Sequence, residues 1–156
     1  MKIQTLHIFD FDGTLVDSSH RYRVKENGKI DLEYWIENAH KVLSDIPLPM
    51  MSFATSLPGG HSGVIATARL WCTLTKVFCK RHNINLPVIA RKGREDCRPG
   101  AALKIAGIKR LLNLKQYREV KELHIYEDNA DYLNALMLGF PGYICRAHFI
   151  PSNQGY

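Results

Sequence analysis

Hydrophobic positions along the chain recur at two spacings, one typical of strands and one typical of helices. Short apolar runs predict strands over residues 4–10, 63–67, 87–90, 122–127 and 142–146. Apolar residues at helical spacing predict helices over residues 32–44, 50–58, 70–82, 101–114 and 130–138. Strands that alternate with helices indicate an α/β fold with a parallel sheet.

Local signals set the expected ends of several elements. Asp31 is the expected N-cap of the helix that follows it. Pro47 and Pro49 interrupt the helical pattern, and the run Pro58-Gly-Gly60 breaks the chain again. Gly139 is expected to end the last helix. Residues 151–156 are expected to form a flexible tail.

Length and composition fit one domain over residues 1–156, because a chain of this size with 46% apolar residues can bury a core. No apolar run approaches the length that crosses a bilayer, so no membrane partner is expected. The chain starts directly with a strand-like pattern rather than a signal peptide. Four cysteines without a C-x-x-C pair do not indicate zinc or a disulfide framework. A cytoplasmic location with reduced thiols is therefore expected.

The net charge of +6 is unevenly distributed. Between Arg69 and Lys121 there are 14 basic and three acidic residues, which gives +11, whereas the remaining seven basic and twelve acidic residues give −5. A basic half beside an acidic half suggests a polyanionic partner that meets an acidic, metal-binding centre. A solvated basic face without a ligand is the alternative interpretation.

Two aspartates, Asp10 and Asp12, follow the first predicted strand and precede Gly13. Residues i and i+2 of a strand share a face, so both carboxylates can point to one place, and glycine then allows a sharp turn. Such a pair can share a hard divalent cation, or it can divide the roles of nucleophile and acid–base catalyst. A solvated turn after a buried strand is the other possibility.

Further candidates follow other predicted strands, whose carboxyl ends form the usual ligand-binding edge of a parallel sheet. Phosphoryl transfer requires a nucleophile, a proton donor and positive charge around the phosphate. Asp10 is the candidate nucleophile, forming an aspartyl-phosphate, and Asp12 is the candidate general acid and later base. Thr67 and Arg69 are candidates for binding phosphate oxygens, and Lys104 for neutralising Asp10 and the phosphate.

The candidate metal is Mg²⁺, which prefers carboxylate oxygens. Asp10 and Asp128 would supply two carboxylates, and Asp12 its backbone carbonyl. Glu127 and Asp131 are second candidates, although Asp131 could equally cap the helix over residues 130–138.

These positions match the four motifs of the HAD (haloacid dehalogenase-like) phosphatases in order. Within that superfamily, the chain is most similar to the polynucleotide 3′-phosphatase domain of phage-type polynucleotide kinase-phosphatases. The resemblance spans roughly residues 5–140. The residues that carry it are Arg21, Ala66-Thr-Ala-Arg69, Arg91, Asp96, Arg98, Lys104 and Glu127-Asp128-Asn129. It implies a three-layer Rossmann-like core with a small cap inserted after the first strand, approximately residues 18–60.

The resemblance implies a Mg²⁺-dependent phosphomonoesterase that removes 3′-phosphates from nucleic-acid ends. Arg21, Arg69, Arg91 and Arg98 would then bind substrate. The alternatives are a nucleotidase or another small-metabolite phosphatase, and a non-catalytic relative that binds nucleic acid or protein. The chain departs from the pattern at Gly100, where an acid that would hold the lysine is expected.

Overall fold

The structure is a computed structural model that describes residues 1–152, so the last four residues of the expected tail lie outside the described residues. Five strands form one sheet in the order β5-β4-β1-β6-β7, and every neighbouring pair is parallel. The strands are β1 (Thr5–Phe9), β4 (His61–Leu70), β5 (Val88–Arg91), β6 (Glu122–Glu127) and β7 (Ile144–Phe149). The predicted α/β fold with a parallel sheet is confirmed.

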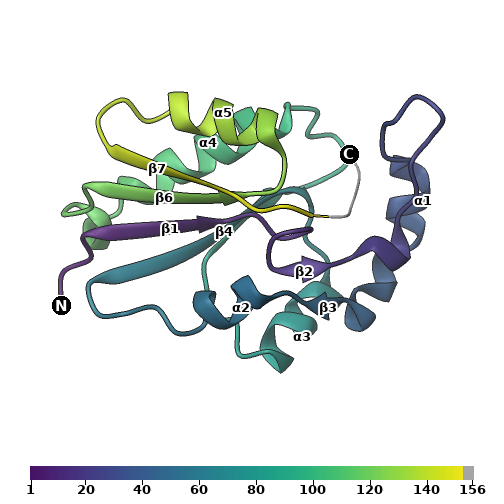
Figure 1. The fold of residues 1–156 in the computed structure, drawn as a ribbon, viewed down its shortest axis with the longest axis horizontal. Coiled ribbons are helices and arrows are strands. Elements are labelled where there is room, and N and C mark those ends of the chain that lie inside the picture. Colours follow the sequence, from purple (N-terminus) through teal and green to yellow (C-terminus); the bar gives the residue numbers. More distant parts are fainter. Residues whose placement is uncertain (153–156) are drawn as a thin grey trace.

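Helices cover both faces of the sheet, which gives three layers (Figure 1). On one face lie α4 (Gly100–Leu112) and α5 (Ala130–Leu138), and on the other lie α2 (Pro49–Ala54) and α3 (Thr73–Arg81). Each face has its own apolar core, because the central strands are buried on both sides. The first core includes Leu6, Ile8, Val64, Ile108, Leu123 and Leu136, and the second includes Phe9, Phe11, Ile65, Val42, Met51 and Phe78.

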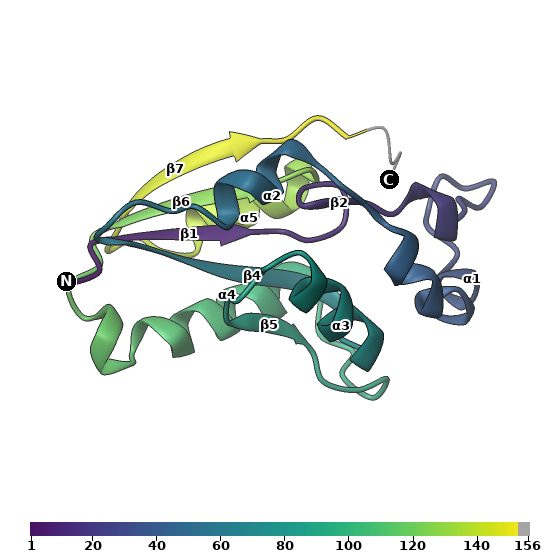
Figure 2. The ribbon, with the colours of Figure 1, turned by 90° about the horizontal axis from the view of Figure 1, so that it is seen from below.

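The segment between β1 and β4 is built from short elements at the carboxyl ends of the strands. They are β2 (Val16–Asp17), the 3₁₀ helices η1 (Ser19–Arg21) and η2 (Ala39–Ser44), α1 (Leu32–Glu37), β3 (Ile46–Pro47) and α2. Figure 2 shows α1 beyond the sheet, whereas α2 lies against it. Because Val42, Met51 and Ala54 are buried in the second core, this segment is packed onto the body of the protein.

Several predicted elements differ from the observed ones. The helix predicted over residues 32–44 is two elements, because Asn38, with φ −98° and ψ 8°, leaves α-helical geometry. The chain then continues as a 3₁₀ helix, in which the Lys41 N–H donates to the Asn38 carbonyl. Leu32, one of the apolar residues at helical spacing, is 68% exposed. The helix predicted over 70–82 begins at Thr73, because β4 runs on to Leu70.

Smaller differences affect the ends of other elements. The helix predicted over 50–58 covers residues 49–54, and the one over 101–114 covers 100–112. The last strand lies at 144–149 instead of 142–146. The predicted cap at Asp31 is confirmed, since its carboxylate accepts a hydrogen bond from the Tyr34 N–H.

The four cysteines are free thiols. Cys79 is buried in the second core, and Cys72, which directly precedes α3, packs against it. Both therefore serve as core fillers. Among residues 1–152, no helix is long and apolar enough to cross a membrane.

Candidate active site

Four charged side chains meet at the carboxyl edge of the sheet, and we call Asp10, Lys104, Glu127 and Asp128 the carboxylate–lysine cluster. Asp10 directly follows β1, Glu127 ends β6, and Lys104 comes from α4. The Lys104 Nζ lies 2.9 Å from the Asp10 Oδ1 and 2.6 Å from the Glu127 Oε2. All four residues are buried, Lys104 to 1% exposure. The structure therefore brings these predicted residues together.

The glycine at position 100 has a steric cause. A Cβ at Gly100 would lie 2.4 Å from the Tyr132 hydroxyl oxygen and 2.9 Å from the Ala68 Cβ, so no acid fits there without displacing its neighbours. Glu127 provides the acid that holds Lys104 instead. The Tyr132 ring lies 5.1 Å from the Lys104 Nζ and adds a cation–π contact.

The electrostatics of the cluster are dominated by burial. Burial raises the pKa of Asp10 to about 6. Burial and the neighbouring Asp10 raise the pKa of Glu127 to about 9. Burial alone would lower the pKa of Lys104, but the negative charges of Asp10 and Glu127 outweigh it, so this pKa lies above its ordinary value. With three carboxylates and one ammonium, full ionisation leaves two uncompensated negative charges.

This donor set fits a hard divalent cation. Carboxylate oxygens of Asp10, Glu127 and Asp128 lie within 4.8 Å of one another, and Mg²⁺ takes such oxygen ligands. Asp131, the other metal candidate, is exposed in the first turn of α5 and lies outside this group. The prediction that Asp131 caps α5 is wrong, because the Asn129 side chain accepts the hydrogen bond from the Tyr132 N–H.

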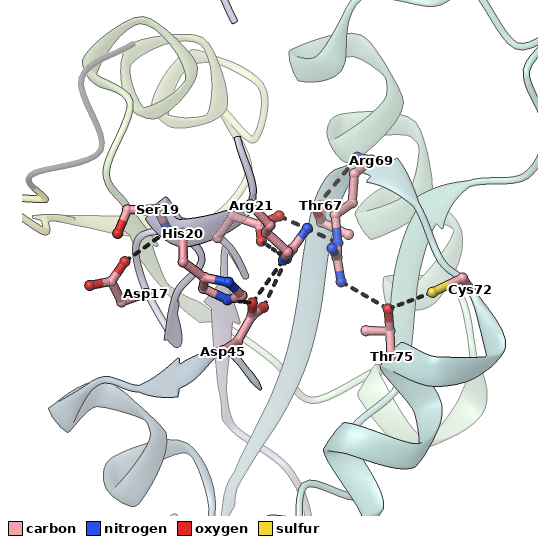
Figure 3. A network of polar contacts seen from close by, with 10 residues as sticks. Asp17, Ser19, His20, Arg21, Asp45, Thr67, Arg69, Cys72 and Thr75 are labelled. Carbon is pink, nitrogen blue, oxygen red and sulfur yellow. Dashed lines mark hydrogen bonds and ion pairs between the residues drawn. The ribbon is translucent and has the colours of Figure 1, made fainter. Parts of the chain in front are cut away.

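Asp12 lies between two arginines from different parts of the chain. Arg21 Nη2 donates to the Asp12 Oδ1 at 2.9 Å, and Arg69 Nε forms an ion pair with the Asp12 Oδ2 at 3.3 Å. Gly13 makes the turn after Asp12 with a φ of +81°, a conformation that favours glycine. Figure 3 shows the guanidinium groups of Arg21 and Arg69 lying near each other.

Thr67 and Arg69 lie where the pairing of β4 with β5 changes register between Ala66 and Leu70. Such an irregularity redirects side chains. The buried Thr67 hydroxyl accepts a hydrogen bond from the Arg69 backbone N–H at 3.4 Å. The Arg69 guanidinium packs 4.8 Å from the centre of the Phe11 ring, and its Nη2 donates to the Thr75 hydroxyl at 3.0 Å.

Arg91 and Arg98 bind groups of their own loop. The Arg91 Nε donates to the Ala68 carbonyl at 2.9 Å and its Nη1 to the Arg98 carbonyl at 2.9 Å. The Arg98 guanidinium donates two hydrogen bonds to the Asp96 carboxylate, at 2.8 and 2.7 Å. Arg91 thus ties the loop to the end of β4, whereas the Arg98 side chain is 44% exposed. A role for either in substrate binding stays a prediction.

Two residues of this region were not among the predicted site residues. Asp45 forms two hydrogen bonds with Arg21, and Ser152 donates to the Asp128 Oδ2 at 2.9 Å. Asp45 lies between a predicted helix and Pro47, and Ser152 lies in the expected tail, so neither carries a local signal of function.

Comparison with known proteins places this geometry in context. A family model described as bacteriophage T5 5′-deoxynucleotidase matches residues 1–95, more than half of the 156 residues. The HAD domain of effector protein Lem4 from Legionella pneumophila has a similar fold. An inactive mutant of that domain superposes with a TM-score of 0.61 at 11% identity, over 99% of this chain and 88% of that one. A second structure of the domain gives 0.56 at 14%, over 98% and 89%. No curated protein matches the chain significantly by sequence.

Proposed function

This chain belongs to the bacteriophage T5 5′-deoxynucleotidase family, and we propose that it is a Mg²⁺-dependent phosphomonoesterase that removes phosphate from nucleoside 5′-monophosphates. The observation that carries the chemistry is the buried Asp10 carboxylate, held by Lys104 beside Glu127 and Asp128. A buried carboxylate with an adjacent ammonium suits a nucleophile that must meet an anionic phosphate.

The proposed reaction has two steps, each with a defined proton transfer. A carboxylate oxygen of Asp10 forms a bond to phosphorus while the ester bond to the leaving oxygen breaks, and Asp12 gives that oxygen its proton. Water then attacks the phosphorus of the aspartyl-phosphate and gives a proton to Asp12, while the bond between phosphorus and the Asp10 oxygen breaks. This step releases phosphate and restores the Asp10 carboxylate. Thr67 and Arg69 are proposed to hold phosphate oxygens. Asp10, Asp128 and the Asp12 carbonyl would hold magnesium, with Glu127 as a further candidate, and the bound ion would supply positive charge beside the phosphate.

Two substrate classes are weighed. The family match favours mononucleotides, the alternative of the sequence analysis, over nucleic-acid 3′ ends. The comparisons give no support for closeness to polynucleotide kinase-phosphatases. The +11 balance between Arg69 and Lys121 still favours a polyanion, so a polynucleotide 3′-phosphatase is the second candidate. The assembled cluster argues against a non-catalytic role, because such a role does not need a buried lysine among three acids.

The test is phosphate release with Mg²⁺ from a deoxynucleoside 5′-monophosphate, a 3′-mononucleotide and a 3′-phosphorylated oligonucleotide. We expect the highest kcat/KM on the 5′-mononucleotide, and a loss of at least about 10³-fold in Asp10→Asn, which removes the nucleophile. Asp131→Asn is the matched control and should retain activity, since this acid is exposed outside the cluster.

Preference for the oligonucleotide would select the second candidate. Full activity of Asp10→Asn would rule out the proposed nucleophile.

A further inference from the structure

The Asp12 carboxylate is held by a buried arginine that is itself held by a second acid. Arg21 and Asp45 have fully buried side chains. The Arg21 Nε lies 2.7 Å from the Asp45 Oδ1, and its Nη2 lies 2.8 Å from the Asp45 Oδ2. The same Nη2 donates to the Asp12 Oδ1 at 2.9 Å. Figure 3 shows Arg21 and Asp45 facing each other, and the His20 Nε2 lies 2.9 Å from the same Asp45 Oδ1 that Arg21 contacts.

The segment before β4 builds this arrangement from short elements. The antiparallel pairing of Asp17 with Ile46 brings Asp45 close to η1, which carries Arg21. Asp45 is also the residue that ends η2, where its N–H donates to the Val42 carbonyl at 3.0 Å. The Trp35 ring lies 5.0 Å from the Arg21 guanidinium carbon and covers it. Arg21 and Asp45 are therefore fixed by backbone pairing and by packing.

Two hydrogen bonds to the same carboxylate fix the position of the planar guanidinium, because its donors have a fixed fork geometry. With Nε and Nη2 bound to Asp45, the direction of the Nη2 donor toward Asp12 is set. The orientation of the Asp12 carboxylate therefore depends on how firmly Asp45 holds the Arg21 guanidinium.

The buried ion pair of Arg21 and Asp45 is not expected to add much to the free energy of unfolding. Burying two ions costs free energy, and well-packed apolar residues often replace buried ion pairs without loss of stability. The Arg21 Nη1 is also buried without a hydrogen-bond partner in the described part of the chain. The guanidinium leaves this nitrogen unbonded while it donates two hydrogen bonds to Asp45 and one to Asp12. This arrangement indicates that the pair serves to orient Asp12.

We propose that Asp45 is a positioning residue which, through Arg21, holds Asp12 in the orientation needed for proton transfer. This inference rests on the proposed function, because it concerns the acid–base role of Asp12. It also assigns a task to the insert between β1 and β4, which supplies both members of the pair.

The test compares two leaving groups in the first turnover. A nucleoside leaves as an alkoxide that needs the Asp12 proton, whereas 4-nitrophenolate leaves without protonation. In Asp45→Asn, we expect nucleoside release from a nucleoside 5′-monophosphate to slow about 10²-fold, the cost of a misplaced catalytic group. The burst of 4-nitrophenol from 4-nitrophenyl phosphate should stay within about threefold, and the later hydrolysis step should slow for both substrates, because it needs Asp12 as base.

The chain offers a matched control within the same insert. Asp31 pairs with Arg23 at 2.9 Å, as Asp45 pairs with Arg21, but the Arg23 side chain is 63% exposed. Asparagine retains the ability to cap α1, so Asp31→Asn should keep both first-turnover rates.

Stability and positioning are separated by a second variant. If Asp45→Asn does not fold, the double variant Arg21→Met/Asp45→Leu removes both charges, and it should fold and show the same selective loss on the nucleotide. Equal losses on both substrates, or no loss on either, would overturn the positioning role while leaving the phosphatase intact. A wild-type protein inactive on both substrates would instead overturn the proposed function, and the positioning role with it.

Discussion

Two groups of polar side chains share one sheet and differ in their burial and their chemistry. The carboxylate–lysine cluster lies at the carboxyl ends of the strands. The second group is a histidine row, formed by His61, His7, His124 and His148 from the neighbouring strands β4, β1, β6 and β7. Adjacent rings of the row have centroids 4.9–5.1 Å apart.

The row is held by contacts among its own rings and with two neighbouring side chains. The nitrogens of His7 and His61 lie 2.8 Å apart, as do those of His124 and His148. Tyr126 bonds His7, and Glu122 bonds His124. Burial, followed by the neighbouring imidazoles, lowers the pKa of His7 to about 4.

The comparison shows that a cluster of titratable side chains does not by itself mark a ligand site. The cluster carries charges that its own members do not balance, so it favours a cation. The row is completed by its own ring nitrogens, a tyrosine and a glutamate, and therefore remains structural. Three experiments test this distinction.

The largest effect is expected from Lys104→Met, which leaves three buried carboxylates without their ammonium. Removing one partner of a buried ion pair costs about 3–5 kcal/mol of unfolding free energy. Nucleotide turnover should also fall about 10²–10³-fold, because a charge that stabilises the phosphate is lost. Denaturant unfolding and steady-state kinetics measure both.

Lys109→Met is the matched control on the same helix, where the lysine is exposed. It should change stability by less than about 0.5 kcal/mol. If the two variants behave alike, the balance of charges in the cluster does not matter.

The next effect is the response to magnesium. At an ion concentration of about 100 times its Kd, binding to the folded state alone stabilises it by about 2.7 kcal/mol. Thermal unfolding of wild-type protein should shift upward accordingly, and Asp128→Asn should lose most of the shift. His124→Gln, a substitution in the histidine row, should keep it. A shift that Asp128→Asn retains would place the ion elsewhere.

The smallest effect concerns acid stability. The pKa of His7 is about 4 in the folded state and 6.5 ordinarily. Between these two pH values, the unfolded chain binds a proton at His7 that the folded chain does not bind. His7 should therefore cost about 2 kcal/mol of stability between pH 7 and pH 5. The raised pKa values of Asp10 and Glu127 act in the opposite direction, since protonation of these acids favours the folded state as the pH falls.

The His7 contribution is isolated by comparing unfolding free energies of wild type and His7→Gln at pH 7 and pH 5. His7→Gln should remove about 2 kcal/mol of the acid-induced loss. The exposed His40→Gln should not. The groups that face His7 are His61, His124, His148, Tyr126 and the acid Glu122. If His7→Gln and His40→Gln lose the same unfolding free energy between pH 7 and pH 5, the lowered pKa of His7 is not the cause of the acid-induced loss.

Part of this site could be expected from local sequence. The apolar run before Asp10, and the one before Glu127, predicted two parallel strands whose carboxyl ends lie at one edge. Asp10, Lys104 and Asp128 were accordingly expected near each other, and they lie near each other. The Gly13 turn also follows from local chemistry, because few other residues adopt its positive φ.

Other features could not be predicted from local signals. The extension of β4 past Thr67 depends on its pairing with β5. Arg21 was expected to bind substrate, but the fold buries its side chain against Asp12 and Asp45. The use of Glu127 to hold Lys104 depends on Tyr132, which fills the space next to Gly100.

The alternation of strands and helices and the acidic strand ends could be read from the sequence, because both depend on residues close together along the chain. The partner that each buried polar side chain receives is set by tertiary contacts. Asp45 reaches Arg21 across 24 positions, and His7 reaches Tyr126 across 119. Such contacts depend on strand register and packing, which the spacing of neighbouring residues does not encode.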